Sequence, residues 1–249
     1  LAALGITKIN VYRQIKVAYF STGDELKKIT EPLGFGDIYD SNLYTISEML
    51  DKPSIKPTSF GIVEDNQDKI KKALLKAASE NDVIITTGGV SVGEADHLKN
   101  VVKKLGHLEL WKVEMKPGRP LAFGKIKNSY FFGLPGNPVS AMVTFEQFVT
   151  HALEKLSGQK KSQALTIYAE IQTDIVKTNR RTEFQRGILT QPRKGQFLVK
   201  KLDQQSSGAL SSMSRANCFI HLSPDLKTIR KGELVLVQPF SNMINTPEN

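Results

Sequence analysis

Three loops of this 249-residue sequence combine glycine, proline and polar side chains in ways that suit the binding of an anion. In one loop, Gly88, Gly89 and Gly93 would let backbone N–H groups approach an anion closely, and Ser91 adds a hydroxyl donor. No lysine follows in the order of a P-loop, so a simple tight turn is the alternative interpretation. The other two loops are Thr22-Gly-Asp-Glu-Leu26 and Pro135-Gly-Asn-Pro138.

Carboxylates accompany this candidate anion site. Asp24 and Glu25 stand in the first loop, and Asp96 follows the glycine-rich one. Their negative charge would repel an anion unless a divalent cation or a hydrogen-bonding ligand is also present. Asp96 equally suits the cap of a following helix, which is the alternative for that residue.

Three cationic side chains lie close together further along the chain. Lys112 and Lys116 are four residues apart, and Arg119 is three beyond. Such a group could hold an oxyanion or a phosphate through several charged donors. The alternative is an ordinary solvated rim, because on a strand Lys112 would share its face with Glu114 and Lys116.

The three loops each follow a predicted strand. Short apolar runs alternate with amphipathic helical stretches from residue 15 to 158, which is typical of βαβ units and a mostly parallel sheet flanked by helices in three layers. The strands expected before the loops cover 16–21, 82–87 and 130–134, with a further one over 58–63. Ligands of such sheets bind at the carboxyl ends of the strands, so we expect the loops to meet there.

The predicted helices have recognisable beginnings. Asp40 and Ser41 are capping candidates for a helix over 42–51, and Asp65 is the candidate cap of the next. Asn137 suits an N-cap and Pro138 the first helical position of a long apolar helix that ends at Gly158. One strand is expected over 108–115 and another over 121–126.

The pattern changes beyond a short basic stretch at 159–163. Period-two segments separated by Gly, Pro, Asn and Ser then predict a small all-β barrel or sandwich. We therefore expect an α/β domain over 15–160 and a C-terminal β domain over 164–249. Residues 1–14 are interpreted as the end of a preceding linker, since the chain begins at Leu1 without methionine and is expected to be a fragment.

Composition narrows the class of protein. The formal net charge of +9 suits an anionic partner, and a solvated basic surface that maintains solubility is the alternative. No recognition-helix, zinc or RNP pattern supports nucleic acid, so a small anionic ligand is the remaining partner class. The apolar runs are too short for a membrane span, and the first residues given show no signal-peptide pattern. The single cysteine, Cys218, excludes an intrachain disulfide and suggests a reducing, cytoplasmic location; its apolar neighbours indicate a buried strand position.

Five motifs in this order closely resemble the molybdopterin molybdenumtransferases, the MoeA and gephyrin E-domain family. They are Ser21-Thr-Gly-Asp-Glu-Leu26, Tyr39-Asp-Ser-Asn42, Thr87-Gly-Gly-Val-Ser-Val-Gly-Glu-Ala-Asp96, Lys116-Pro-Gly-Arg-Pro120 and Gly133-Leu-Pro-Gly-Asn-Pro-Val-Ser140. Arg181-Thr-Glu-Phe-Gln-Arg-Gly187 and Ser206-Ser-Gly208 resemble the family's final β domain. The resemblance spans nearly the whole chain.

The resemblance implies a transferase of molybdenum cofactor biosynthesis, in which molybdate displaces AMP from adenylylated molybdopterin with Mg²⁺ present. It implies functional acidic positions at Glu25, Asp65 and Asp96 and basic ones at Lys112 and Lys116. Of these, Asp96, Glu25, Lys112 and Lys116 are expected to be catalytic, with Glu25 and Asp96 as metal ligands. The residues expected to bind the cofactor are Thr22, Gly23, Asp24, Asp40, Ser41, Gly88, Gly89, Ser91, Gly93, Arg119, Pro135, Gly136, Asn137 and Pro138.

The resemblance also implies partners and rivals. The full-length family members are expected to be homodimers, and the related molybdopterin adenylyltransferase is a possible partner. That adenylyltransferase is also the nearest rival function, although the added β domain favours molybdenum insertion. A non-catalytic scaffold is the second rival. Family members carry two further N-terminal domains that complete the active site, so we expect the fragment to bind without necessarily turning over.

Overall fold

The computed structural model describes residues 1–89, 97–159, 164–192 and 195–240, without the side chain of Leu110. The first part of the chain forms a six-stranded sheet in the order β4-β1-β5-β9-β8-β6. Its strands are β1 (Ile15–Thr22), β4 (Ile55–Val63), β5 (Val83–Thr87), β6 (Gly106–Lys112), β8 (Pro120–Ile126) and β9 (Ser129–Leu134). The pairings from β4 to β9 are parallel, whereas β8 is antiparallel to both of its neighbours. The sheet is therefore mixed, with its four parallel strands adjacent.

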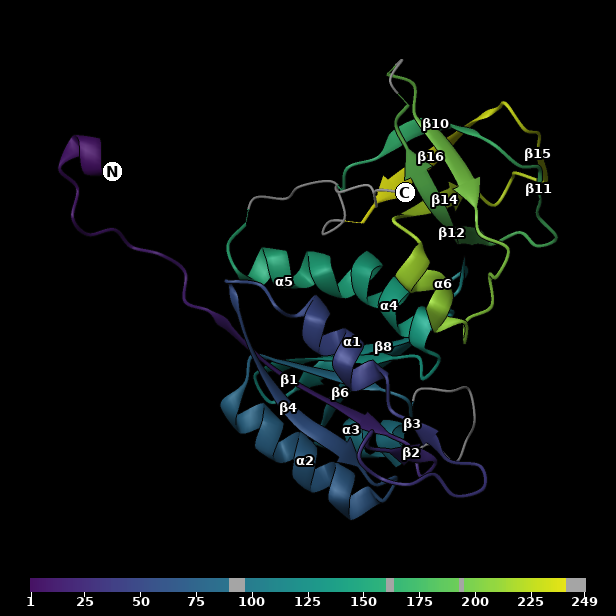
Figure 1. Cartoon of the computed structure of the whole chain (residues 1–249). Helices are drawn as coiled ribbons and strands as arrows, with labels where there is room; N and C mark the ends of the chain where they lie inside the picture. Colours follow the sequence, from purple (N-terminus) through teal and green to yellow (C-terminus); the bar gives the residue numbers. More distant parts are fainter. Residues whose placement is uncertain (90–96, 160–163, 193–194, 241–249) are drawn as a thin grey trace.

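Helices cover both faces of this sheet (Figure 1). On one face lie α2 (Gln67–Glu80) and α3 (His97–Leu105), packed on an apolar cluster that includes Phe20, Leu74 and Val101. On the other face lie α1 (Asn42–Met49) and a long helix made of α4 (Pro138–Thr144), the π-helical turn η2 (Phe145–Val149) and α5 (Thr150–Leu156). The predicted three-layer α/β architecture is confirmed.

One predicted helix cap is wrong, and at a second helix one of the two predicted candidates is confirmed. The α2 helix is capped by Asn66, whose side chain accepts hydrogen bonds from the backbone N–H groups of Asp68 and Lys69, and not by Asp65. The Asp65 carboxylate is therefore released from a capping role. At α1, Ser41 occupies the N-cap position without a side-chain bond, and Asp40 Oδ1 instead accepts from the N–H groups of Asn42 and Leu43 at 2.9 and 3.2 Å.

The second part of the chain is a closed five-stranded barrel. Its strands are β10 (Ile167–Ile171), β12 (Thr182–Thr190), β13 (Leu198–Lys201), β14 (Cys218–Leu222) and β16 (Leu234–Pro239), and a β12–β13 pairing closes the ring. Cys218 is fully buried, as predicted, and burial raises its pKa to about 12. Smaller elements are β11 (Ile175–Val176) with β15 (Thr228–Ile229), β2 (Leu26–Lys27) with β3 (Ile38–Tyr39), α6 (Leu210–Arg215) and η1 (Ala2–Leu4).

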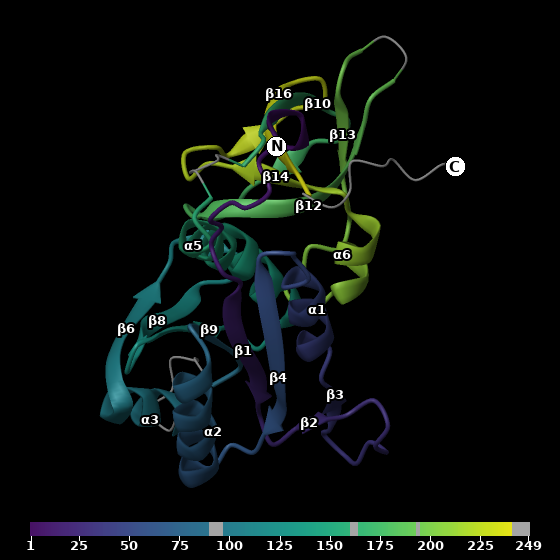
Figure 2. The ribbon, with the colours of Figure 1, turned by 90° about the vertical axis from the view of Figure 1, so that its left-hand side faces the viewer.

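The strand expected over 108–115 is wrong at its end. The chain leaves the first sheet after Lys112, and β7 (Met115–Lys116) joins the barrel sheet instead, parallel to β12. An apolar cluster continues this contact, with Val143 and Met115 from the first part packed against Phe184 and Phe219 of the barrel. Figure 1 shows α4 and α5 between the two sheets and residues 1–14 as an extended arm, and in the turned view of Figure 2 α5 lies beneath β12 of the barrel. The described residues contain no helix that could cross a membrane.

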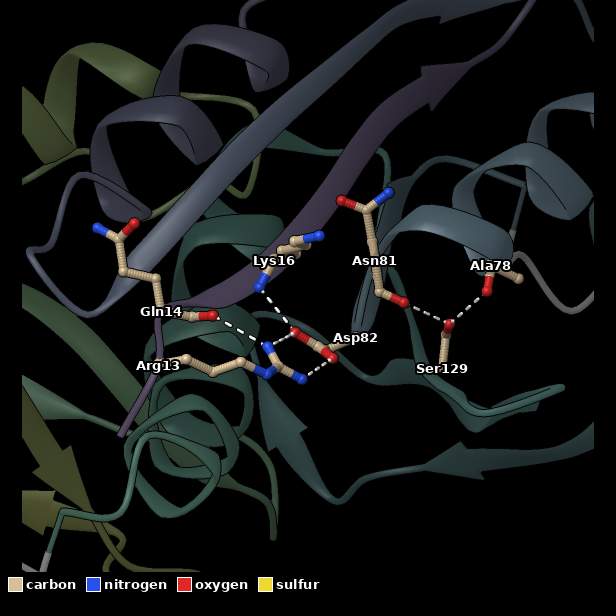
Figure 3. Close-up of polar contacts among 7 residues, drawn as sticks. All are labelled: Arg13, Gln14, Lys16, Ala78, Asn81, Asp82 and Ser129. Atoms are coloured by element: carbon tan, nitrogen blue, oxygen red, sulfur yellow. Dashed lines mark hydrogen bonds and ion pairs between the residues drawn. The ribbon is translucent and has the colours of Figure 1, made fainter. Parts of the chain in front are cut away.

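The amino ends of the central strands are held by a dense set of polar contacts (Figure 3). The Arg13 guanidinium donates to both carboxylate oxygens of Asp82, each at 2.7 Å, and the backbone N–H of Lys16 donates to Asp82 at 2.9 Å. Ser129 places its buried hydroxyl 2.6 Å from the carbonyl oxygen of Asn81 and 3.1 Å from that of Ala78. These bonds tie β1, β5 and β9 together before the strands enter the core.

Candidate functional site

A cavity of about 520 Å³ opens at the opposite, carboxyl ends of the four parallel strands. A volume of this size is typical of small-molecule sites. Each of these strands contributes a loop to the cavity. One of these loops, the segment with Asp65 after β4, was not among the three anion-binding loops predicted from the sequence. The described lining of the cavity is Thr22, Gly23, Glu25, Leu26, Ile38, Tyr39, Asp40, Ser41, Asn42, Asp65, Thr87, Gly88, Gly89, Pro120, Pro135, Gly136, Asn137, Pro138 and Ser140.

The two glycines at the end of β5 are required by packing. Gly88 has φ +83°, and a Cβ atom there would lie 2.3 Å from the carbonyl oxygen of Thr22. Its N–H donates to Leu134 O at 3.2 Å, so that donor is already used by the fold. Gly89 has φ +61° and is crowded by Leu98 and Thr22. The tight-turn interpretation therefore accounts for Gly88 and Gly89, while Ser91 and Gly93 lie outside the described residues.

Four oxygen atoms around the cavity are buried without a hydrogen-bond partner in the described part of the chain. They belong to Thr22 (Oγ1), Asp40 (Oδ2), Asn42 (Oδ1) and Asp65 (Oδ1). An unpaired buried polar atom costs about 1–3 kcal/mol, so such atoms are kept few and usually have a function. Because all four accept hydrogen bonds or bind cations, the cavity offers a concentrated acceptor surface.

The loop after β9 is held against the start of α1. Asn42 Nδ2 donates to the carbonyl oxygen of Gly136 at 2.8 Å, which fixes the orientation of the side-chain amide. In this orientation the amide oxygen, Oδ1, is buried and has no hydrogen-bond partner among the described residues. Pro138 occupies the first position of α4 as predicted, and Asn137 is the N-cap residue, although its side chain makes no capping bond. Pro135 and Pro138 both line the cavity.

Only some of the predicted acidic site residues line the cavity. Glu25 and Asp65 line the cavity, whereas Asp24 is exposed outside it and accepts a hydrogen bond from the backbone N–H of Asp65 at 3.3 Å. Asp96 lies outside the described residues. No cluster of three or more His, Cys, Asp or Glu side chains capable of holding a metal ion occurs within the described ranges.

The three cations are not gathered around the cavity. Among the described lining residues neither lysine nor arginine occurs. Arg119 is exposed and pairs with Glu114 at 2.9 Å, and Lys112 is exposed at the end of β6. Lys116 lies 3.7 Å from Glu183 of the barrel. Pro117 and Gly118, between Lys116 and Arg119, are buried, and Pro120 lines the cavity. The 116–120 loop therefore connects the cavity to the barrel.

Arg186 is a residue that the sequence analysis did not single out. It is 1% exposed, and burial lowers its pKa to about 10, so it stays protonated at neutral pH. Its guanidinium donates to the carbonyl oxygens of Gln204 and Ser206 at 3.2 and 3.0 Å and to the Ser212 hydroxyl at 3.1 Å. The loop that it holds reaches the cavity side of α4, where the N–H of Val139 donates to Ser207 O at 3.1 Å. The available signal was its place in Arg181-Thr-Glu-Phe-Gln-Arg-Gly187, the segment that resembles the family's final β domain.

Two protein-family models together match most of the chain. Residues 18–155 match the family model of a probable molybdopterin binding domain, and residues 168–240 match the MoeA C-terminal region, domain IV. The chain is 42% identical to a molybdopterin molybdenumtransferase of Haemophilus influenzae over 98% of its own length and 61% of that protein. It is 33% identical to the Nostoc sp. molybdopterin molybdenumtransferase, of which it covers 56%.

Solved structures agree with this assignment. The molybdopterin biosynthesis MoeA protein of Pyrococcus horikoshii aligns over 96% of this chain and 57% of its own, with a TM-score of 0.79 and 27% identity. A molybdenum cofactor biosynthesis protein of Pyrococcus furiosus aligns over 96% of this chain and 73% of its own, with a TM-score of 0.72 and 28% identity. The chain belongs to the MoeA family. It spans about three fifths of the length of the curated relatives named here.

Proposed function

We propose that the cavity at the carboxyl ends of the strands binds molybdopterin, and that the protein inserts molybdate into adenylylated molybdopterin with release of AMP. The observation that carries this proposal is the set of four unpaired buried oxygens of Thr22, Asp40, Asn42 and Asp65. A pterin presents an amino group and ring N–H donors, which such acceptors would satisfy. The names of the relatives, molybdopterin molybdenumtransferases, support the same substrate.

Mg²⁺ is proposed as the accompanying cation. It prefers oxygen ligands and is usually held by one or two carboxylates together with substrate phosphates. The described donor set fits that mode, because Glu25, Asp40 and Asp65 are spread around the cavity without forming a complete protein cage. Glu25 and Asp96 are our proposed ligands, and the bound ion would neutralise phosphate charge beside these carboxylates.

The protein's own groups then have separate tasks. Asp40, Asn42 and Asp65 orient the pterin through hydrogen bonds, and the 135–138 loop shapes the wall that excludes water. Lys112, Lys116 and Arg119 attract molybdate through their positive charge from positions outside the described cavity lining. Since molybdate, phosphate and the carboxylates are all anionic, neutralising charge is expected to be a large part of catalysis.

The direct test supplies the protein with adenylylated molybdopterin, molybdate and Mg²⁺ and measures AMP release. Release that depends on molybdate supports insertion. Formation of the adenylylated adduct from molybdopterin and ATP, without molybdate, would instead assign the protein to the adenylyltransferase function. The match of residues 168–240 to the MoeA C-terminal region favours insertion over that rival. Because the chain covers only part of its relatives, molybdopterin binding is measured separately by equilibrium dialysis.

Assembly and location are proposed on the same basis. We expect the whole protein to be a homodimer that receives its substrate from molybdopterin adenylyltransferase in the cytoplasm. Sedimentation of the whole protein with and without that enzyme tests both associations, and a monomer that ignores the enzyme would contradict them.

A further inference from the structure

Lys116 belongs to the α/β part of the chain by sequence and to the barrel by hydrogen bonding. Through β7 it lies in register with Glu183 on β12, in a parallel pairing that also joins Met115 to Thr182. Its ammonium lies 3.7 Å from Glu183 Oε1, and its side chain remains 47% exposed. One side of the ammonium thus faces the barrel while another stays accessible to solvent.

The carboxylate of Glu183 is fixed from its other sides. It is only 4% exposed, its Oε1 accepts from the amide of Asn179, and its Oε2 accepts from Gln185 Nε2 at 2.7 Å. The Asn179 side chain is itself held, because its oxygen accepts from the backbone N–H of Arg181 at 3.0 Å. A buried carboxylate with these partners has a fixed position, so the ion pair constrains the Lys116 side chain and not that of Glu183.

An ammonium has three N–H donors and no acceptor. A single contact with Glu183 leaves donors available for an oxyanion on the exposed side. A free lysine would lose rotamer entropy on being fixed by its ligand. A lysine already held by a buried carboxylate would have lost part of that freedom before the anion arrives.

We infer that Glu183 is a positioning residue that fixes the Lys116 ammonium for molybdate. This inference rests on the proposed function. The barrel would then take part in molybdate binding through strand pairing and one ion pair, without itself touching the anion. Glu183 is not a catalytic residue in this account.

Electrostatics and positioning predict opposite results for Glu183→Gln. The substitution removes a negative charge near the anion, so Coulomb attraction alone would make molybdate bind more tightly. Loss of the fixed partner makes it bind more weakly. We expect roughly tenfold weaker binding, equivalent to ~1.4 kcal/mol.

The experiment titrates molybdate by calorimetry into the intact chain as wild type, Lys116→Ala, Glu183→Gln and Glu183→Asp. Glu183→Asp keeps the charge and should recover part of the lost affinity. The matched control is Glu170→Gln, which removes a barrel carboxylate that also accepts an amide N–H, from Gln196, and should bind as wild type. Equilibrium dialysis with molybdopterin supplies a second readout, because general damage to the fold would weaken both ligands.

The outcomes are distinct. Weaker molybdate binding by Glu183→Gln, with molybdopterin binding retained, supports the inference. Unchanged or tighter molybdate binding, while Lys116→Ala loses it, overturns the positioning role and leaves the proposed function intact. Unchanged binding by Lys116→Ala removes the proposed role of Lys116 and the inference with it. If Glu183→Gln does not fold, the same comparison is read from Glu183→Asp, for which wild-type affinity would contradict the inference.

Discussion

The two ends of the parallel strands treat their polar atoms in opposite ways. At the amino ends, Asp82 and Ser129 are fully engaged by neighbouring groups (Figure 3). At the carboxyl ends, oxygens of Thr22, Asp40 and Asp65 are buried without partners in the described chain. The first end ties strands together, whereas the second keeps acceptors ready for a ligand.

This difference teaches how stability and function are divided along one sheet. A satisfied buried bond contributes to folding, whereas an unsatisfied oxygen weakens folding until a ligand supplies its donor. Substitutions at the amino ends should therefore change the free energy of unfolding and spare binding. Substitutions of unpaired oxygens at the carboxyl ends should do the reverse.

The largest expected effect is a loss of unfolding free energy at Gly88, where the end of β5 packs closely against Thr22. In Gly88→Ala the new Cβ would approach Thr22 O to 2.3 Å at a φ of +83°. We expect a loss of on the order of 3 kcal/mol, from left-handed strain of about 1–2 kcal/mol plus the clash. Urea unfolding measures it. Gly61→Ala is the control, since it has φ +72° with nothing within 4 Å, and an equal loss in both would exclude the clash.

The second effect separates binding from folding at the carboxyl ends. Asp65→Asn replaces a carboxylate that is not a cap, and we expect tenfold or greater loss of molybdopterin affinity, at least ~1.4 kcal/mol, with stability unchanged or higher. Equilibrium dialysis and urea unfolding measure the two quantities. The adjacent Asn66→Ala removes the α2 cap and should cost ~1 kcal/mol of stability while binding persists. The opposite pattern would mean that Asp65 is structural.

A third, smaller effect tests the amino ends. Ser129→Ala deletes the hydroxyl shared by the carbonyls of Ala78 and Asn81, and we expect a loss of about 1 kcal/mol without any change in molybdopterin affinity. Ser79→Ala is the control, because its hydroxyl bonds a carbonyl at an exposed helix position. Weaker binding by Ser129→Ala would show that the two ends of the strands are coupled.

The smallest effect is the pH dependence of the Arg13–Asp82 contact. The Arg13 guanidinium holds the pKa of the Asp82 carboxyl below its usual range, against the opposing effect of partial burial. Stability from this contact is therefore fully present above the unfolded pKa of about 3.9 and is lost as pH falls through the folded value. Unfolding followed from pH 7 to pH 2 should show a smaller acid-induced loss for Asp82→Asn than for wild type. Asp225→Asn controls for the change in net charge, and identical curves for Asp82→Asn and wild type would contradict the prediction.

Much of the fold could be predicted because its signals are local. The apolar run over 82–87 predicted β5, and the amphipathic helical pattern after the candidate cap Asp65 predicted α2. Strand β14 around Cys218 followed from period-two alternation. The end of β6 could not be predicted in this way, because the register that sends Met115 to the barrel depends on a strand some seventy residues later.

The candidate site was only partly predictable for the same reason. Glycine, proline and carboxylate motifs indicated the loops around the cavity, but choosing between Asp65 and Asn66 as the α2 cap required backbone geometry. The close spacing of Lys112, Lys116 and Arg119 predicted a single anion-binding group. In the structure Arg119 instead pairs with Glu114, and Lys116 lies beside Glu183. Charged partners distant in sequence leave no local pattern.

The sequence alone determined the family resemblance, the α/β-then-β order and the identity of most loops around the cavity, since these depend on residue type and spacing. Only the tertiary structure decided which oxygens stay unpaired and which cation faces which carboxylate. The physical reason is that hydrogen-bond satisfaction depends on every neighbour that folding brings within about 3 Å, from any part of the chain.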